Sequence, residues 1–369
     1  MDDLKYWLGF SLIPGIGKVK FDLLEKGFPN MEDAWRASAG ELRAAGLDDK
    51  AVEAIIGGRA RVFPDAEMEK LEKFKIKAVT TKDPEYPARL KEIFDYPPVL
   101  FIRGSFLPED ERCLSVVGTR RATVYGRQVT EDMVLELVRN NITIVSGLAR
   151  GIDVIAHRTA LAAGGRTYAV LASGLDIIYP GEHAGMAREI IENGALVSEY
   201  PPGVKPKAEH FPRRNRIMSG ISLGVLVIEA GEKSGALITA NQALEQNREV
   251  FAIPGSILSP VSRGTNRLIQ AGAKLVTSCA DVLEELNLSV AAFQPEMQQV
   301  SPESETEAGL LKHLSDQPLH IDELCRLSNM PTSAVSSTLA IMELKGLVRQ
   351  DGGMNYFMPR PVRVVSSKG

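Results

Sequence analysis

Short apolar runs alternate with amphipathic segments of helical length between residues 112 and 285. The runs are CLSVVG (113–118), ITIVSG (142–147), TYAVLA (167–172), ALVSE (195–199), GVLVIEA (224–230), EVFAIPG (249–255) and AKLVT (273–277). Continuous β-branched runs that alternate with helices are typical of parallel strands buried on both faces of a sheet. The pattern therefore predicts a Rossmann-like, doubly wound α/β core. The runs KIKAVTT and PPVLFIRG, between residues 75 and 105, predict edge structure ahead of it.

The first 65 residues consist of short apolar helical stretches that are separated by glycines. This pattern predicts a small all-α domain of the helix-hairpin-helix or SAM-like type. LIPGIG, residues 12–17, fits the helix-hairpin-helix pattern of apolar-x-Pro-Gly-apolar-Gly. In that motif the glycines let backbone N–H groups at a helix start approach a phosphate. Phosphate binding and a plain helical turn both remain open here.

The last part of the chain divides into a linker and a third domain. Residues 287–308 lose all periodicity and are rich in Gln, Glu, Ser and Pro, which predicts a flexible linker. Residues 309–360 show two helical patterns, a turn, a third helix and a hairpin around Asp351-Gly352-Gly353. This order predicts a winged helix. The predicted domains are thus 1–65, 75–286 and 309–360, with the linker at 287–308.

Composition narrows the class of protein. The net charge is −4 at pH 7, which argues against a non-specific polycation but leaves a local basic patch open. Cys113, Cys279 and Cys325 are isolated and form no CxxC pair, so neither a disulfide framework nor a zinc site is indicated. No apolar run approaches the roughly 20 residues of a membrane span, and the start MDDLKYWLGFSLIPGIG lacks the basic region and long apolar stretch expected of a signal peptide. We expect a reduced, cytoplasmic protein without a membrane partner.

Four glycine-rich turns each follow a predicted strand and open a predicted helix. They are GTRRATVYG (118–126), SGLARGIDVIAH (146–157), GEKSGALITA (231–240) and SRGTNRLI (262–269). Such turns gather at the carboxyl edge of an open parallel sheet, where free N–H groups at helix starts favour an anion. None has the dinucleotide-binding or P-loop form, and no cofactor is predicted. The residues expected to face phosphates are Gly118, Thr119, Gly147, Arg150, Gly151, Ser234, Gly235, Thr239, Gly264 and Asn266.

The segment HFPRRNR places arginines around an aromatic residue. Residues 205–217 carry five positive charges, from two lysines and three arginines, against Glu209. A guanidinium binds a phosphate through two hydrogen bonds, and Phe211 offers a face on which an unpaired base can stack. Because a duplex hides its base faces, this combination favours single strands. The alternative is a solvated loop with Phe211 packed into the core.

The residues do not fit conventional catalysis. None of the five histidines lies in a recognised nucleophile motif, and GxSxG and HExxH are absent. Ser146 and Ser234 are interpreted as helix caps or phosphate contacts. Asp153 and His157 are four residues apart and could pair on one helix. We predict no catalytic residue and no metal site.

Taken in order, the motifs between residues 112 and 285 resemble those of the DprA/Smf (DNA-processing protein A) family. SVVGTRRATVYG looks like that family's first Rossmann turn, VSGLARGIDVIAHRTAL like its second and GLDIIYP like its third. SEYPPG…HFPRRNRIMSGIS, VLVIEAGEKSGALITANQALEQNREVFAIPG and GTNRLIQAGA complete the series. The resemblance covers nearly half the chain, and the remainder agrees in its predicted architecture.

The resemblance implies a binding protein of natural transformation and recombination rather than an enzyme. Such a protein holds incoming single-stranded DNA, displaces or coexists with single-strand-binding protein, and loads a RecA-type recombinase. It also implies a homodimer formed through the Rossmann domain. The predicted DNA contacts are Arg120, Arg121, Lys205, Lys207, Phe211, Arg213, Arg214, Asn215 and Arg216.

The chain departs from the family pattern in one place. Some relatives carry a lysine directly after the Tyr-Pro of the third turn and an asparagine two places further on. Gly181 and His183 occupy these positions here, which puts a DNA contact there in doubt. Lys205 or Lys207 is available to supply the charge instead.

Two other classes of protein fit the sequence less well than a single-stranded DNA-binding protein. A nucleoside-monophosphate phosphoribohydrolase carries PGGxGTxxE, whereas EAGEKSGALITANQALE lacks both the paired glycines and the GT, although Glu232 or Glu245 could still take the acidic role. A winged-helix transcription regulator would read DNA through PTSAVSSTLAIMELKG. That segment offers only Lys345 against Glu343, which is a poor surface for phosphates or bases.

Overall fold

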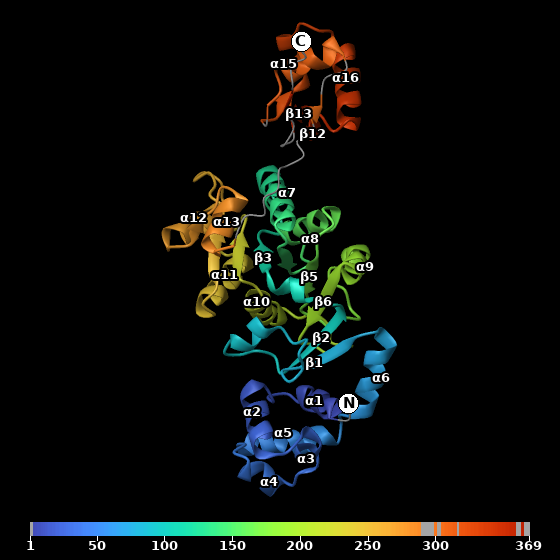
Figure 1. Ribbon diagram of the computed structural model, residues 1–369, viewed down its shortest axis with the longest axis vertical. Coiled ribbons are helices and arrows are strands. Elements are labelled where there is room, and N and C mark those ends of the chain that lie inside the picture. Colours follow the sequence, from blue (N-terminus) through green and yellow to red (C-terminus); the bar gives the residue numbers. More distant parts are fainter. Residues whose placement is uncertain (1–2, 289–298, 301–303, 316, 359–362, 365–369) are drawn as a thin grey trace. The chain divides into compact units, whose positions relative to one another are not determined.

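The computed structural model describes residues 3–288, 299–300, 304–315, 317–358 and 363–364 (Figure 1). The chain divides into two compact units, Met1–Ala291 and Ala292–Gly369, and each is described by itself. Most of the predicted linker, at 289–298 and 301–303, lies outside the described residues.

The first unit begins with short helices that pack around aromatic side chains. These are α1 (Leu4–Ser11), α2 (Lys18–Gly27), α3 (Met31–Arg36), α4 (Ala39–Ala44), α5 (Asp49–Arg59) and α6 (Pro64–Phe74). The side chains of Asn30, Ser38 and Asp48 each accept a hydrogen bond from a backbone N–H and so cap α3, α4 and α5. The ring of Phe10 meets that of Trp35 edge-on at 5.0 Å. The predicted all-α character of this part is confirmed.

One sheet forms the centre of the first unit. Its strands are β1 (Lys77–Thr80), β2 (Val99–Gly104), β3 (Cys113–Val117), β4 (Thr143–Ser146), β5 (Thr167–Val170), β6 (Gly194–Ser198), β7 (Gly224–Val227), β8 (Glu249–Ala252) and β9 (Lys274–Leu275). Their order in the sheet is β1-β2-β6-β5-β4-β3-β7-β8-β9. All neighbours from β6 to β9 run parallel, whereas β1 and β2 form an antiparallel edge. The predicted edge structure is therefore a hairpin-like addition to a parallel sheet.

Helices cover both faces of the parallel strands. Leu114 and Val116 of β3 pack with α7 (Val124–Arg139), α8 (Ile152–Ala162) and α13 (Cys279–Glu285). Cys113 and Val117 of the same strand point to the other face, towards α10 (His210–Ile221) and α11 (Gly235–Glu245). Alternate residues of one apolar run thus enter two different cores. The Rossmann-like, doubly wound core is confirmed.

The order of the strands across the sheet reverses between two neighbouring, parallel strands. The connection from β3 through α7 leads to β4 on one side, and the connection from β7 through α11 leads to β8 on the other. β3 and β7 lie next to each other, with Ser115 opposite Val225. In open α/β sheets, ligands bind at the carboxyl ends of the strands at such a point.

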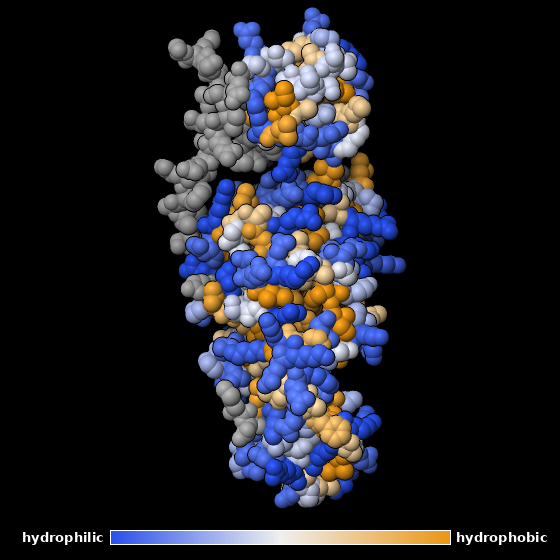
Figure 2. All heavy atoms as spheres, turned by 90° about the vertical axis from the view of Figure 1, so that its right-hand side faces the viewer, coloured by the Kyte–Doolittle hydropathy of each residue, from blue (hydrophilic) through white to orange (hydrophobic). Residues whose placement is uncertain are grey.

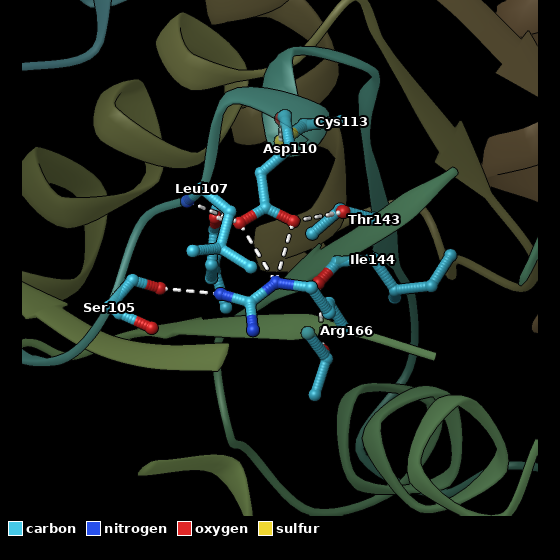
Figure 3. Close-up of polar contacts among 9 residues, drawn as sticks. Ser105, Leu107, Asp110, Cys113, Thr143, Ile144 and Arg166 are labelled. Atoms are coloured by element: carbon cyan, nitrogen blue, oxygen red, sulfur yellow. Dashed lines mark hydrogen bonds and ion pairs between the residues drawn. The ribbon is translucent and has the colours of Figure 1, made fainter. Parts of the chain in front are cut away.

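A buried carboxylate, that of Asp110, accepts hydrogen bonds from several segments at the amino-terminal ends of β3, β4 and β5 (Figure 3). Asp110 lies in the short 3-10 segment Pro108–Glu111 and accepts hydrogen bonds from Arg166 Nε at 2.8 and 2.9 Å. It also accepts from Thr143 Oγ1 at 2.8 Å and from Leu107 N at 2.8 Å. The hydroxyl of Tyr168 is a further donor. This cluster of buried, paired groups fixes the segment that leads into β3.

The second unit has the fold that the sequence predicts for it. It contains α14 (Glu305–Leu311), α15 (Ile321–Ser328) and α16 (Thr332–Leu344), followed by the hairpin of β12 (Arg349–Asp351) and β13 (Asn355–Phe357). β11 (Leu319–His320) completes a small sheet in the order β11-β13-β12, and β10 (Gln299–Val300) pairs with β14 (Arg363–Val364). Leu310, Leu324 and Leu339 are fully buried in its core. The winged helix is confirmed.

Candidate nucleic-acid interface

A cavity of about 510 Å³ opens at the carboxyl ends of β3 and β7, where the order of the strands across the sheet reverses. The turn after β3 contributes Gly118, Thr119 and Arg120, and the turn after β7 contributes Gly231 and Lys233. The other residues that line it are Val117, Ala149, Asp153, Phe211, Pro212, Arg214, Asn215, Met218, Ser234, Gly235, Ala236, Ile238, Thr239 and Val261. Three of the four predicted turns thus meet at one site, as the rule for parallel sheets requires.

Close backbone packing shapes the turn after β3. Thr119 N donates to the carbonyl of Glu229 at 2.7 Å, and Thr119 O accepts from Ile152 N at 3.2 Å. A Cβ on Gly118 would lie 2.5 Å from Cγ1 of Ile152. Gly151 has a φ of +77°, and a Cβ there would lie 2.2 Å from Thr119 O. Glycine is therefore required on both sides of this contact.

The side chain of Glu229 also holds the turn after β3 in place. No role was predicted for this residue from the sequence. Its carboxylate is buried and accepts from both the N–H and the hydroxyl of Thr123, which caps α7. The carboxylate fills the space beside Gly126, where a Cβ would lie 2.2 Å from Oε2. The signal in the sequence is a single acid at the end of the apolar run GVLVIEA.

An aromatic surface lies beside the cavity. Phe211 and Tyr179 meet edge to face with ring centroids 5.9 Å apart. The Arg120 guanidinium carbon lies 5.7 Å from the centroid of the Phe211 ring. Tyr179 is 52% exposed and comes from the turn that follows β5, far from Phe211 in the sequence. Tyr179 lies in the GLDIIYP turn, and no contact was predicted for it from the sequence.

The predicted cations divide into an exposed and a buried group. Arg120, Arg121, Lys205, Lys207 and Arg213 are exposed. Lys233, which was not selected from the sequence, is also exposed and lines the cavity. Of these exposed cations, Arg120 and Lys233 line the cavity, and Arg120 lies over the Phe211 ring.

Arg214 lies beneath the cavity rather than on the surface. It is buried, and its guanidinium donates to the carbonyl of Gly147 at 2.8 Å and to that of Val170. Its Nε donates to Asn215 Oδ1 at 3.1 Å. Burial lowers the pKa of Arg214 to about 10, and burial raises the pKa of the neighbouring Asp153. The predicted contact of Arg214 and Asn215 with DNA stays a prediction, and the geometry favours a positioning role for both.

Arg216 is also buried and is bound to acidic partners. Its Nη2 lies 2.6 Å from Glu199 Oε2, and its Nε lies 3.1 Å from Asp95 Oδ2. The segment HFPRRNR is thus part of helix α10 and not a solvated loop. Arg213 points outwards, whereas the next three residues point into the protein.

Several residues that were expected to face phosphates have partners within the protein, and their contact with phosphate stays a prediction. Arg150 donates two hydrogen bonds to the carboxylate of Glu182, both at 2.7 Å. Asn266 bonds the N–H and the carbonyl of Gly255 and so closes a loop before α12 (Arg263–Gln270). Gly264 lies against the carbonyl of Ala230. These residues, like Gly147 and Gly151, do not line the cavity.

The groups considered for catalysis have structural partners. Asp153 and His157 do not pair, because His157 Nδ1 lies 2.7 Å from Thr167 Oγ1 and Asp153 accepts from Ala149 N. Burial lowers the pKa of His157 to about 3. Ser146 Oγ donates to Val116 O at 2.7 Å, and Ser234 caps α11.

The acids of the enzyme alternative lie outside the cavity. Glu232 is exposed, 4.0 Å from Arg263. Glu245 ends α11, about 15 Å along the helix from the end that faces the cavity. Within the described ranges, His, Cys, Asp and Glu side chains form no group of three or more suited to a metal ion. None of the helices in the same ranges combines the length and apolar character that a membrane crossing demands.

The sequence and the fold of the chain are similar to those of known proteins. Residues 77–287 match the model of the family described as DNA recombination-mediator protein A, and residues 294–354 match the DprA winged helix domain. The protein named Smf from Synechocystis is 35% identical over 390 residues, which cover 95% of this chain and 98% of that one. The X-ray structure of DNA processing protein A from Streptococcus pneumoniae matches with a TM-score of 0.66 at 38% identity, over 76% of this chain and 96% of that one.

A second solved structure concerns the single-stranded DNA binding mode of DNA processing protein A from Helicobacter pylori. It matches with a TM-score of 0.52 at 30% identity, over 57% of this chain and 96% of that one.

Proposed function

Because the chain belongs to the DNA recombination-mediator protein A family, we propose that its first unit binds single-stranded DNA without reading the base sequence. The observation that carries the proposal is the cavity between the ends of β3 and β7, where an aromatic surface lies beside exposed cations. A related protein for which a single-stranded DNA binding mode is described supports it.

The cations and the aromatic rings of the interface contact different parts of the strand. Arg120 and Lys233 reach the cavity from two turns, and the start of α11, at Ser234 and Gly235, brings the positive end of that helix to it. These groups bind phosphates and position the strand without reading bases. Phe211 and Tyr179 offer ring faces to unpaired bases, which stack with little regard to sequence. A duplex hides the base faces and so loses this second contribution.

The wider role is part of the same proposal and is supported by membership of the family. The protein protects incoming single-stranded DNA in natural transformation and recombination, loads a RecA-type recombinase on it, and displaces or coexists with single-strand-binding protein. It acts by binding and not as an enzyme.

A homodimer formed through the Rossmann domain is part of the proposal. Ile257 and Leu258, in the loop before α12, are 82% and 85% exposed, and Leu275 of β9 is 44% exposed. Figure 2 faces the right-hand side of Figure 1, away from α12, and shows further hydrophobic residues among hydrophilic ones over the α/β part. Exposed apolar side chains of this kind support association with another protein chain.

Single-stranded DNA is expected to bind more tightly than duplex of equal length, with strong dependence on salt. If about four phosphates are neutralised, log K should fall against log[salt] with a slope near −3, at about 0.7 per phosphate. Fluorescence anisotropy with labelled strands across a salt series measures both quantities. Equal affinity for duplex, or an affinity that salt does not change, would contradict the proposal.

Arg120→Ala is expected to weaken binding of all single-stranded sequences alike, by about tenfold, and to lower the salt slope by about 0.7. The reason is the loss of one exposed phosphate contact and of the guanidinium beside the Phe211 ring. Arg43→Ala serves as the control, because Arg43 is an exposed arginine of the helical part, paired with Asp49. If Arg120→Ala lowered the melting temperature but bound DNA normally, Arg120 would instead be structural.

A further inference from the structure

A second cavity, of about 660 Å³, lies within the first unit where the helical part meets the α/β part. The turn between α1 and α2, which carries the LIPGIG sequence, forms one wall. Residues 95–99, ahead of and at the start of β2, and 199–201, after β6, form another. Pro212, Arg213 and Arg216 of α10 reach it from the α/β part. Of the residues that line it, Pro212 also lines the first cavity.

Four of the residues that line this cavity each carry one buried polar atom with no hydrogen-bond partner. These atoms are Glu199 Oε1, the hydroxyl of Tyr200, Arg216 Nη1 and Gln242 Oε1. Tyr200 and Arg216 are 9% and 7% exposed. Buried polar groups in folded proteins are nearly always paired. Four unpaired groups around one cavity therefore indicate a ligand that supplies their partners.

The same side chains are held in place by their other atoms. Arg216 is bound to Glu199 through Nη2 and to Asp95 through Nε, which leaves Nη1 unused. Gln242 donates through Nε2 to the carbonyl of Pro212 at 3.0 Å, which leaves its oxygen unused. The Tyr200 ring stacks on that of His210 with centroids 4.2 Å apart. The unpaired atoms are thus fixed before any ligand arrives, which lowers the cost of ordering them.

The chemistry of the four atoms distinguishes between kinds of ligand. Glu199 Oε1 and Gln242 Oε1 accept hydrogen bonds, Arg216 Nη1 donates, and the Tyr200 hydroxyl can do either. A phosphate has only acceptors and would be repelled by the Glu199 carboxylate. A nucleobase carries donors and acceptors along one edge and has flat faces. The flat walls of the cavity, formed by Tyr96 and by prolines 14, 97, 98, 201 and 212, suit such faces.

We propose that the second cavity holds a nucleobase of the same single strand that occupies the first, an inference that rests on the proposed function. Three consecutive residues at the start of α10 connect the two sites. Phe211 lines the first cavity, Pro212 lines both, and Arg213 lines the second. The side chain of Arg213 is 64% exposed, and its Nη2 lies 3.9 Å from Glu199 Oε2, which leaves its other donors for the phosphate between the two bases.

The LIPGIG turn acquires a role in this arrangement. Lys18 opens α2 next to that turn, and its ammonium lies 4.9 Å from the centroid of the Tyr96 ring. The N-cap of α2 is Gly17, which has no side chain to occupy the first N–H groups. The N–H groups of the turn are therefore placed to bind the backbone of the strand next to the base, while the ammonium of Lys18 pairs with Asp22 at 3.1 Å. The helical part then extends the DNA-binding surface of the α/β part.

Tyr200→Phe in the full-length protein tests the proposal. The expected result is three- to tenfold weaker binding of long single strands, because one hydrogen bond to the base is lost. Oligodeoxycytidylate strands from about 4 to about 20 nucleotides serve as probes. The shortest strands fill only the first cavity and should bind wild type and variant equally. The melting temperature should not fall, because the hydroxyl that is removed has no partner.

Tyr6→Phe is the matched control. Tyr6 is also buried, but its hydroxyl donates to Glu32 Oε1 at 3.1 Å, and Tyr6 lines neither cavity. This variant should bind strands of every length like the wild type. Equal affinity of Tyr200→Phe and wild type for long strands would overturn the proposal, as would an equal loss for strands of every length. If wild type bound no single strand at all, the proposed function and this inference would fall together.

Photo-cross-linking gives a test that needs no variant. A long strand carrying 5-iodocytosine is irradiated with the wild-type protein, and the modified residues are identified by mass spectrometry. Adducts at Tyr96 or Tyr200, together with adducts at Phe211 or Tyr179, are the expected result. Adducts at Phe211 or Tyr179 alone would leave the proposed function standing and would refute the second site.

Discussion

Replacing Phe211 by alanine is expected to lower the affinity for single-stranded DNA by about 5- to 150-fold, while the melting temperature stays nearly unchanged. One base stacked on an aromatic ring contributes about 1–3 kcal/mol, and each 1.4 kcal/mol is about tenfold in affinity. Phe211 is only partly buried and belongs to none of the buried hydrophobic clusters. Its neighbours are the exposed Tyr179 and Arg120. Anisotropy and calorimetry on the same preparations measure the two quantities.

Two further variants separate stacking from other effects. Phe211→Tyr keeps the ring and should retain most of the affinity. Phe63→Ala removes an exposed phenylalanine, 64% accessible, from the start of α6 and should leave DNA binding unchanged. A large loss of stability in Phe211→Ala with intact binding would show that the ring is a packing residue.

The fold was largely predictable because parallel strands leave a strong trace in a sequence. A strand such as Cys113–Val117 is buried on both faces, so every position is apolar or small. Alternating strands and helices then determine which ends of the strands meet. The antiparallel direction of β1 and β2 was not predictable, because an edge strand of either direction reads as the same short apolar run.

The candidate site was predictable where topology alone decides. Thr119, Arg120, Ser234 and Gly235 line one cavity because they follow β3 and β7, which are neighbours with opposite connections. Arg150, Gly264 and Asn266 are also in glycine-rich turns, but their side-chain and backbone contacts are local. A glycine-rich turn alone does not distinguish a ligand contact from a loop closure.

The face of helix α10 on which each arginine of HFPRRNR lies decides whether it is exposed. The number of positive charges in the segment carries no information about that face. His210, Arg214 and Ile221 recur at helical spacing and are buried, whereas Arg213 is exposed. Pro212 does not argue against a helix here, because proline is tolerated in the first turn. No helix was predicted for this segment, so Arg214 was grouped with the exposed arginines as a DNA contact. Tyr179 could not be found in this way, since only the folded chain brings it to Phe211.

Asp110→Ala is expected to destabilise the first unit by about 3 kcal/mol, which corresponds to a melting temperature lower by about 6–12 °C. The Asp110 side chain is 4% exposed and bonds Arg166, Thr143, Tyr168 and the N–H of Leu107. Removing it leaves the Arg166 guanidinium, itself 23% exposed, without its carboxylate. The other donors lose their acceptor as well, at a cost of about 1–3 kcal/mol for each one left unsatisfied in the interior. Thermal unfolding of the full-length protein measures the loss.

The position of Asp110 gives this variant a second, separate readout. The carboxylate lies at the amino-terminal ends of β3, β4 and β5, and the first cavity lies at the opposite end of β3, about 15 Å away along a five-residue strand. DNA affinity measured well below the unfolding transition should therefore stay close to that of the wild type. Asp65→Ala is the matched control, because Asp65 pairs with Lys5 at an 80% exposed position, where loss of the pair costs less than about 1 kcal/mol. A stable Asp110→Ala protein with weakened DNA binding would mean that the cluster acts on the binding edge and not on the fold.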